Sequence, residues 1–138
     1  MGSDARRTLY YCPKCQATLN PNVKIILSAR KGTRQGLVLL SPRPGEYDAI
    51  AAEELALEPG DKVEFFCPLC RADLTSRADD NLAELGYRGD RGEEGRVDFS
   101  RIFGEHATYF VSKGEVRSFG AHASHYSDAN FFGEWGDV

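Results

Sequence analysis

Short hydrophobic runs, separated by polar segments that favour turns, characterise this chain from end to end. Runs of four to eight residues that are rich in β-branched and aromatic side chains are typical of strands. In the first half we expect strands at 9–12, 23–29, 37–41 and 62–66. In the second half we expect them at 82–87, 97–103, 106–111 and 115–119. The pattern therefore predicts a mainly β protein.

The turns between these runs indicate how the strands pair. Residues 23–29 and 37–41 are separated by the polar, glycine-containing segment 30–36, which predicts a β-hairpin with a basic tip. Strands after residue 81 are joined by short turns such as Ser112-Lys113-Gly114, so we expect an antiparallel meander over 75–120. Because residues 37–40 are all apolar, we expect at least one strand of the hairpin to be covered on both faces.

One segment does not follow the strand pattern. Residues 48–57 are rich in alanine and contain two leucines, and these residue types favour helix. The turn sequence Glu58-Pro59-Gly60-Asp61 follows at once and leaves room for only a few turns of helix. We therefore predict a short helix or an irregular crossover here.

Two ten-residue segments, 55 residues apart, repeat one pattern. Residues 10–19 read YYCPKCQATL and residues 65–74 read FFCPLCRADL. We call them the first and second knuckle. They contain every cysteine of the chain, namely Cys12, Cys15, Cys67 and Cys70. A Cys-x-x-Cys turn lets two thiolates reach one metal ion, and two such turns supply the four ligands of a tetrahedral site.

The two knuckles resemble the zinc-ribbon and rubredoxin-like class of metal sites. The resemblance implies a closed four-thiolate site that stabilises the fold, with zinc as the default metal and iron as the alternative. Such knuckles often carry glycine directly after the second cysteine, where this chain has Gln16 and Arg71. We therefore predict a zinc-ribbon-like four-cysteine site joined to antiparallel β-hairpins and the C-terminal β-meander.

Two other uses of the cysteines are less favoured by the sequence. Disulfides are typical of small secreted proteins, and no secretory signal is visible here. A redox-active Cys-Pro-x-Cys motif needs a helix that begins at the motif and lowers the thiol pKa. Asn20-Pro21 follows Cys15 too closely for such a helix.

Length and charge limit the remaining possibilities. A chain of 138 residues suits a single domain, in which we expect 1–8 to be disordered, 9–74 to form the double-knuckle half and 121–138 to form an aromatic tail. A net charge of −4 argues against a general nucleic-acid binder. No apolar run is long enough to span a bilayer, so we expect no membrane association. Reduced thiols without an export signal predict the cytoplasm.

A basic cluster is the second candidate site. Arg30, Lys31 and Arg34 lie in the predicted hairpin tip, within a stretch from 24 to 43 that has no acidic residue. They suit contact with nucleic acid. The competing interpretation is an ordinary surface loop whose basic side chains pair with the acidic residues of 46–64.

The histidines are the third candidate site. His106 and His122 both end a Phe-Gly-x-His motif, and His125 follows three residues later. If the strands around them pair, the imidazoles can approach one another and hold a second metal ion. The competing interpretation is surface imidazoles at two similar strand ends.

No catalytic motif is present, and a site closed by four cysteines leaves no open position for substrate, so we expect no enzyme. The sequence favours a zinc-binding, non-enzymatic binding or adaptor protein whose partner is another protein. A nucleic-acid-binding zinc ribbon, and a rubredoxin-like iron redox protein or metalloenzyme, are the alternatives. The aromatic tail, with Phe131, Phe132 and Trp135, predicts docking onto the protein's own sheet or a homodimer.

Overall fold

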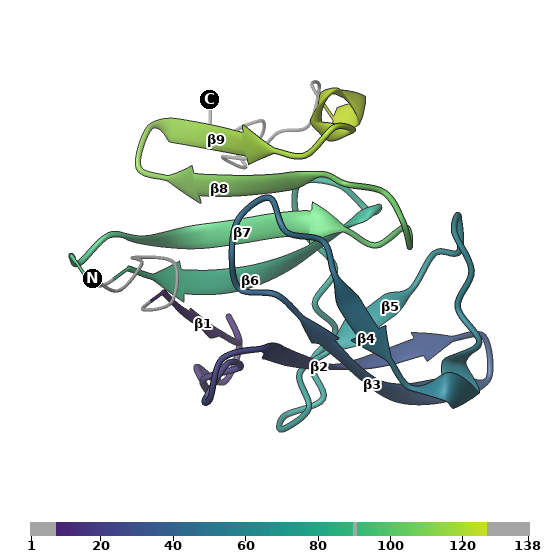
Figure 1. The fold of residues 1–138 in the computed structure, drawn as a ribbon. Helices are drawn as coiled ribbons and strands as arrows, with labels where there is room; N and C mark the ends of the chain where they lie inside the picture. The colour runs from purple at the N-terminus through teal and green to yellow at the C-terminus, as the bar shows by residue number, and fades with distance from the viewer. Residues whose placement is uncertain (1–7, 90, 127–138) are drawn as a thin grey trace.

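Two antiparallel sheets form the framework of residues 8–89 and 91–126, the parts of the chain that this computed structural model describes (Figure 1). The larger sheet has the strand order β1 (Leu9–Tyr11), β6 (Leu82–Arg88), β7 (Glu94–Ser100), β8 (Thr108–Ser112) and β9 (Glu115–Phe119). The smaller sheet has the order β4 (Ala49–Ala51), β3 (Arg34–Leu40), β2 (Ile25–Lys31) and β5 (Glu64–Phe66). Two short 3₁₀ helices, η1 (Glu53–Leu55) and η2 (Ala123–Tyr126), complete the elements. The prediction of a mainly β protein with a C-terminal meander is confirmed.

Several boundaries differ from the sequence-based expectation. The tip of the β2–β3 hairpin is only Gly32 and Thr33, because Gly32 adopts a φ of 61° and permits a two-residue turn. Arg30, Lys31 and Arg34 therefore lie in the strands and not in a loop. The segment 48–57 contains the short strand β4 followed by η1, so its helical part is only three residues long. The predictions for 1–7 and for the tail beyond 126 concern residues outside the described part.

The two halves of the chain repeat one order of elements. In each half an entry strand leads into a knuckle, and a hairpin and a further strand follow: β1, β2, β3 and β4 in the first half, and β5, β6, β7 and β8 in the second. The pairing registers correspond. Val38 on β3 lies opposite Ala51 on β4, and its equivalent Val97 on β7 lies opposite Phe110 on β8. The elements β1–β4 and β5–β8 thus form an internal structural repeat, and β9 and η2 follow it. In the sequence, only the two knuckles make this repeat visible.

The repeats exchange their entry strands. β1 pairs with β6 of the second half, with Tyr10 opposite Tyr87, and β5 pairs with β2 of the first half, with Phe65 opposite Ala29 (Figure 1). Each sheet therefore contains strands from both halves. Because neither half contains all the strands of one sheet, the halves are interlocked.

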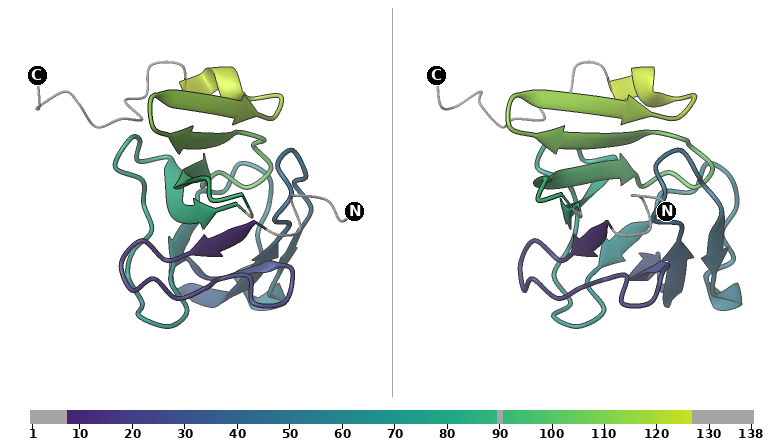
Figure 2. Two further views of the ribbon diagram at one scale, coloured as in Figure 1. Left: turned by 90° about the vertical axis from the view of Figure 1, so that its left-hand side faces the viewer. Right: turned by 60° about the vertical axis from the view of Figure 1, so that its left-hand side comes forward.

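The main core lies between the two sheets, which form the two layers seen in Figure 2. Corresponding positions of the repeats supply much of it, as in the pairs Leu19 and Leu74, Leu27 and Leu85, and Val38 and Val97. A second, smaller core on the other side of the larger sheet contains Leu82, Ala107, Tyr109, Val111 and Tyr126. Since β6 borders both cores, its first six residues are all buried.

The smaller sheet does not have such a cover on its outer face. Leu37 and Ile50 are 52% and 57% exposed, so the expectation that a strand of the β2–β3 hairpin is covered on both faces is wrong for the described residues. The strands with both faces covered are β6 and β8 of the larger sheet. No helix of the described residues has the length and hydropathy to cross a membrane.

Candidate metal centre

Each knuckle is a tight turn whose amide groups point at the first cysteine. Cys12 Sγ accepts hydrogen bonds from the N–H groups of Lys14 and Cys15 at 3.3 and 3.4 Å. In the second knuckle, Cys67 Sγ accepts from Leu69 and Cys70, both at 3.4 Å. N–H donors of this kind stabilise a thiolate, so both turns are shaped for a deprotonated sulfur.

Backbone hydrogen bonds close the two turns in the same way. The Cys12 N–H donates to the carbonyl of Ala17 at 3.0 Å, and the Cys67 N–H donates to the carbonyl of Ala72 at 3.0 Å. Gln16 and Arg71, which follow the second cysteine of each knuckle, both adopt a φ of 68°. This is the position at which the sequence departs from the usual glycine, and the left-handed backbone explains the glycine preference.

The four cysteine sulfurs converge. Cys12 Sγ lies 3.7 Å from Cys70 Sγ, and Cys15 Sγ lies 3.7 Å from Cys67 Sγ. All four sulfurs lie within 4.8 Å of one another. A tetrahedron with metal–sulfur bonds of about 2.3 Å has edges of about 3.8 Å, whereas a disulfide requires about 2.05 Å. The four residues thus fit a metal ion, and none of the cysteines is in a disulfide.

The cluster is buried on one side and open on the other. Cys12 and Cys67 are fully buried, whereas Cys15 and Cys70 are exposed. The first pair anchors the site in the core, because both residues belong to the main hydrophobic cluster. The second pair gives an ion a route from solvent.

The amide groups also affect the acidity of the thiols. Burial alone would raise the pKa of Cys67, but hydrogen bonds from the N–H groups of Cys70 and Leu69 and from the Cys70 and Cys15 thiols together outweigh it and lower this pKa to about 7. At Cys12 burial prevails and raises the pKa. Neighbouring thiols cannot all ionise without a compensating cation, because like charges at these distances repel. A divalent ion removes this obstacle.

Comparison of the chain with models of protein families, with curated proteins and with solved structures gave no match.

The basic residues are brought onto one end of the β2–β3 hairpin, next to acidic partners. Arg30 Nε lies 2.8 Å from the Glu64 carboxylate, and Lys31 Nζ lies 2.7 Å from the Asp61 carboxylate. These contacts lower the pKa of both acids. Two of the three candidate cations are thus paired as the competing interpretation expects, and contact with nucleic acid stays a prediction.

The histidines are also brought together, with His106 in the loop before β8 and His122 and His125 at η2. The ring centroids of His106 and His122 lie 5.7 Å apart, and those of His122 and His125 lie 5.3 Å apart. However, His122 Nδ1 accepts a hydrogen bond from the His106 N–H, and His125 Nδ1 lies 2.8 Å from the Glu105 carboxylate. Within 8–89 and 91–126, only the cysteines bring enough ligand atoms together for a metal ion. A second metal site stays a prediction.

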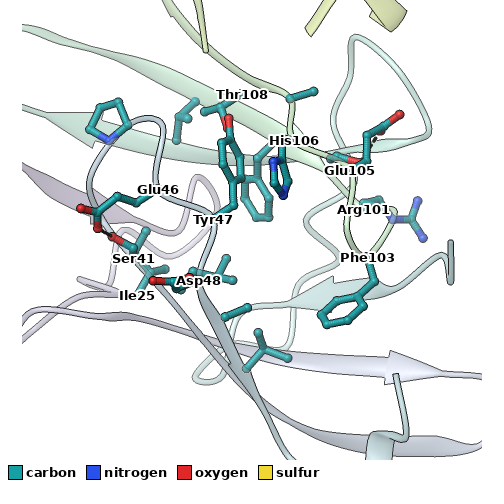
Figure 3. Close-up of a pocket in the computed structure, with 18 of the residues that line it drawn as sticks. Ile25, Ser41, Glu46, Tyr47, Asp48, Arg101, Phe103, Glu105, His106 and Thr108 are labelled. Carbon is teal, nitrogen blue, oxygen red and sulfur yellow. Dashed lines mark hydrogen bonds between the residues drawn. The ribbon is translucent and has the colours of Figure 1, made fainter. Parts of the chain in front are cut away.

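Two features were missed from the sequence. Glu84 and Asp98 are buried acidic residues that lie opposite each other on β6 and β7, where Arg77 and Arg96 pair with them. Their signal was visible, since each interrupts an apolar run. The other feature is a cavity between the sheets (Figure 3). It had no sequence signal, because its lining comes from segments far apart in the chain.

Proposed function

We propose that Cys12, Cys15, Cys67 and Cys70 hold one structural zinc ion in a non-enzymatic binding protein. The observation that carries the proposal is the convergence of the four sulfurs, with two 3.7 Å edges. Four thiolates complete the coordination of zinc and leave no position for substrate. Iron uses the same ligands, and zinc is preferred because a thiolate tetrahedron without further redox groups is its usual site.

The position of the cluster supports a structural role. The cysteines follow β1 and β5, which are only three residues long and are edge strands of the larger and the smaller sheet. A strand of three residues makes few hydrogen bonds and is readily detached. An ion bound to both knuckles fastens the two strands together and joins the interlocked halves.

Support for a protein partner comes from the outer face of the smaller sheet. Ile26, Leu39 and Ile50 lie side by side across β2, β3 and β4, and Leu37 is two residues along on the same face. Leu37 and Ile50 are more than half exposed, and Ile26 and Leu39 are half-buried. Contiguous apolar surface of this kind is typical of protein interaction sites. A cytoplasmic location is proposed with it, because thiol ligands need a reducing environment.

The zinc proposal is tested by removing the ion. Part of the binding free energy of a structural zinc site is folding free energy, on the order of 10 kcal/mol in small zinc peptides. We expect a chelator, or the Cys67→Ser substitution, to lower the melting temperature strongly. Added zinc should restore the melting temperature of the chelated wild type but not that of Cys67→Ser. A metal-free protein that melts within a degree or two of the zinc-loaded one would show that the ion is not structural.

The protein-partner proposal is tested on the apolar row. Leu37→Ser combined with Ile50→Ser should abolish the capture of a protein partner and leave the melting temperature nearly unchanged. Val116→Ser on β9, which is 36% exposed, is the matched control. Sedimentation of the purified protein first separates a homodimer from a foreign partner. Salt-sensitive retention on heparin that is lost in Arg34→Ala would favour the nucleic-acid alternative.

A further inference from the structure

The cavity between the sheets has apolar walls supplied by both of them. It has a volume of about 210 Å³. Val38 and Phe65 line it from the smaller sheet, and Leu85, Val97, Phe99 and Phe110 line it from the larger one. No cysteine lines it, so it is separate from the proposed zinc site. A dry apolar cavity of roughly 150 Å³ holds a benzene molecule, which makes this one large enough for a bicyclic ring.

The rim of the cavity is held in place before any ligand arrives. The Tyr47 ring stacks on the His106 ring, with centroids 4.4 Å apart and an interplanar angle of 4° (Figure 3). Tyr47 Oη donates a hydrogen bond to the Phe119 carbonyl at 3.0 Å and accepts one from Thr108 Oγ1 at 2.8 Å. These contacts fasten the loop 41–48 to β8 and β9. A preformed site loses less entropy on binding than one that must be ordered.

The positive charges around the cavity are already engaged. The guanidinium of Arg101 points away from Tyr47 and His106 (Figure 3). It donates to the carbonyls of Val63 and Asp80 at 2.9 and 2.6 Å. Arg43, the other cation that lines the cavity, lies 3.5 Å from the Glu46 carboxylate. Arg101 Nη1 also lies 3.8 Å from the Asp80 carboxylate. Each guanidinium thus has an acidic partner and is not left to attract an anion into the cavity.

Of the three acidic residues that line the cavity, Asp48 is the one without a partner among the described residues, as a comparison with Glu105 shows. The Glu105 carboxylate accepts hydrogen bonds from Ser100 and Tyr126 and lies 2.8 Å from His125. Asp48 also lines the cavity, on the same side as Tyr47 and Glu46 (Figure 3). Its side chain is exposed and has no hydrogen bond or ion pair to any of the described residues. The rim therefore has an excess of negative charge at Asp48.

We propose that this cavity binds a small organic cation, an amine whose apolar body is no larger than about two fused rings. The body occupies the space between the sheets, where aromatic side chains surround it, and the ammonium group lies at the rim beside Asp48. Aromatic faces attract cations as well as apolar groups, so the walls and the rim favour the same ligand. The proposal goes beyond the zinc site and does not depend on it.

The test compares three probes of one ring system and different charge. Tryptamine carries an ammonium group, indole is neutral, and indole-3-propionate carries a carboxylate. Each is titrated into the ¹⁵N-labelled, metal-loaded full chain, and the amide shifts of Val97 and Phe110 report binding. We expect tryptamine to bind about three- to fivefold more tightly than indole, as suits one partly exposed ion pair. Indole-3-propionate should bind more weakly than indole.

The variants separate the charge from the cavity. Asp48→Asn should reduce tryptamine to the affinity of indole and leave indole unchanged, and Asp48→Lys should make indole-3-propionate the tighter of the two charged probes. Glu54→Gln removes an exposed carboxylate that does not line the cavity and should have no effect. Equal affinity for all three probes, or a preference for tryptamine that survives in Asp48→Asn, would overturn the assignment of a cation. If the amide shifts of Val97 and Phe110 do not change at millimolar probe, the cavity is not a binding site. The zinc content of the protein is measured separately, so this result would leave the zinc proposal standing.

Discussion

At Gln16 and Arg71 the backbone is in the left-handed region, with a φ of 68° at both positions. An L-residue other than glycine pays about 1–2 kcal/mol for this conformation. Both residues follow the second cysteine of a knuckle, and the turn needs this geometry to bring its two thiolates to one point. The same strained conformation thus occurs in both knuckles, which indicates that each turn is shaped to bring its own two sulfurs together.

Arg71→Gly should stabilise the protein. Glycine adopts the left-handed conformation without a steric penalty, although it loses more backbone entropy on folding. We expect a net gain of about 0.5–1 kcal/mol in the free energy of unfolding, measured by denaturant titration of the metal-loaded protein. Arg71→Ala is the control, because it removes the same exposed side chain and keeps the penalty. A gain of equal size in both variants would place the effect in the arginine side chain and not in the backbone.

Asp98 should make stability depend on pH in an unusual direction. Burial raises the pKa of Asp98 to about 6, although Arg96 and Ser76 oppose the shift. The folded protein therefore keeps a proton that the unfolded chain releases near pH 4, so stability falls as the pH rises from 4 to 6. Relative to Asp98→Asn, we expect the wild type to lose about 2–3 kcal/mol in the free energy of unfolding across this interval.

Asp80→Asn is the control for that prediction, with the opposite sign. Lys62 lowers the pKa of the exposed Asp80. The stabilisation from Asp80 is therefore present above the pKa of the unfolded chain and is lost as the pH falls. If the wild type and Asp98→Asn differ by the same amount at pH 4 and pH 6, Asp98 titrates as it does in the unfolded chain and the prediction is wrong.

At the scale of elements, the exchange of β1 and β5 matters most. Hydrophobic alternation indicated where the strands lie, because each strand has one face toward the core. It did not indicate which strands pair, since β1 suits either sheet by its pattern alone. The strand ends at Lys31 and Glu94 were missed because charged side chains at strand ends reach solvent and leave no apolar signal. The end at Ser100 was expected three residues later, because the apolar residues Ile102 and Phe103 continue the pattern beyond the strand. In 48–57 the pairing of β4 with β3 takes Ala49–Ala51 into the smaller sheet, so only Glu53–Leu55 form a helical turn in spite of the helix propensity of the alanines.

Removal of the metal should loosen the two entry strands together. β1 and β5 each have only three residues and are held by the knuckles that follow them. We expect hydrogen exchange of residues 9–19 and 64–74 to accelerate in the chelated protein much more than that of β7, which is paired on both sides. Equal acceleration across the whole chain would indicate global unfolding, and no acceleration in the knuckles would mean that the metal does not fasten these strands.

At the scale of the whole molecule, two interlocked repeats enclose the main core between them and converge on one cluster of cysteines. The cysteine cluster was predictable from the sequence, because a duplicated Cys-x-x-Cys with no cysteine left over is typical of a four-thiolate metal site. The cavity and the apolar outer face were not, because both depend on how distant strands are placed side by side. The structure shows why the cysteine cluster lies where it does: the knuckles of the two halves meet there.

We propose that one zinc ion is bound by the four cysteine sulfurs. X-ray absorption at the metal K-edge of the purified protein tests it most directly, because the edge energy identifies the element and the fine structure counts the ligands. We expect a zinc edge with four sulfur scatterers at about 2.3 Å. An iron edge with the same four sulfurs would contradict the choice of zinc. Nitrogen or oxygen ligands in place of sulfur, or no bound metal at all, would contradict the four-cysteine centre.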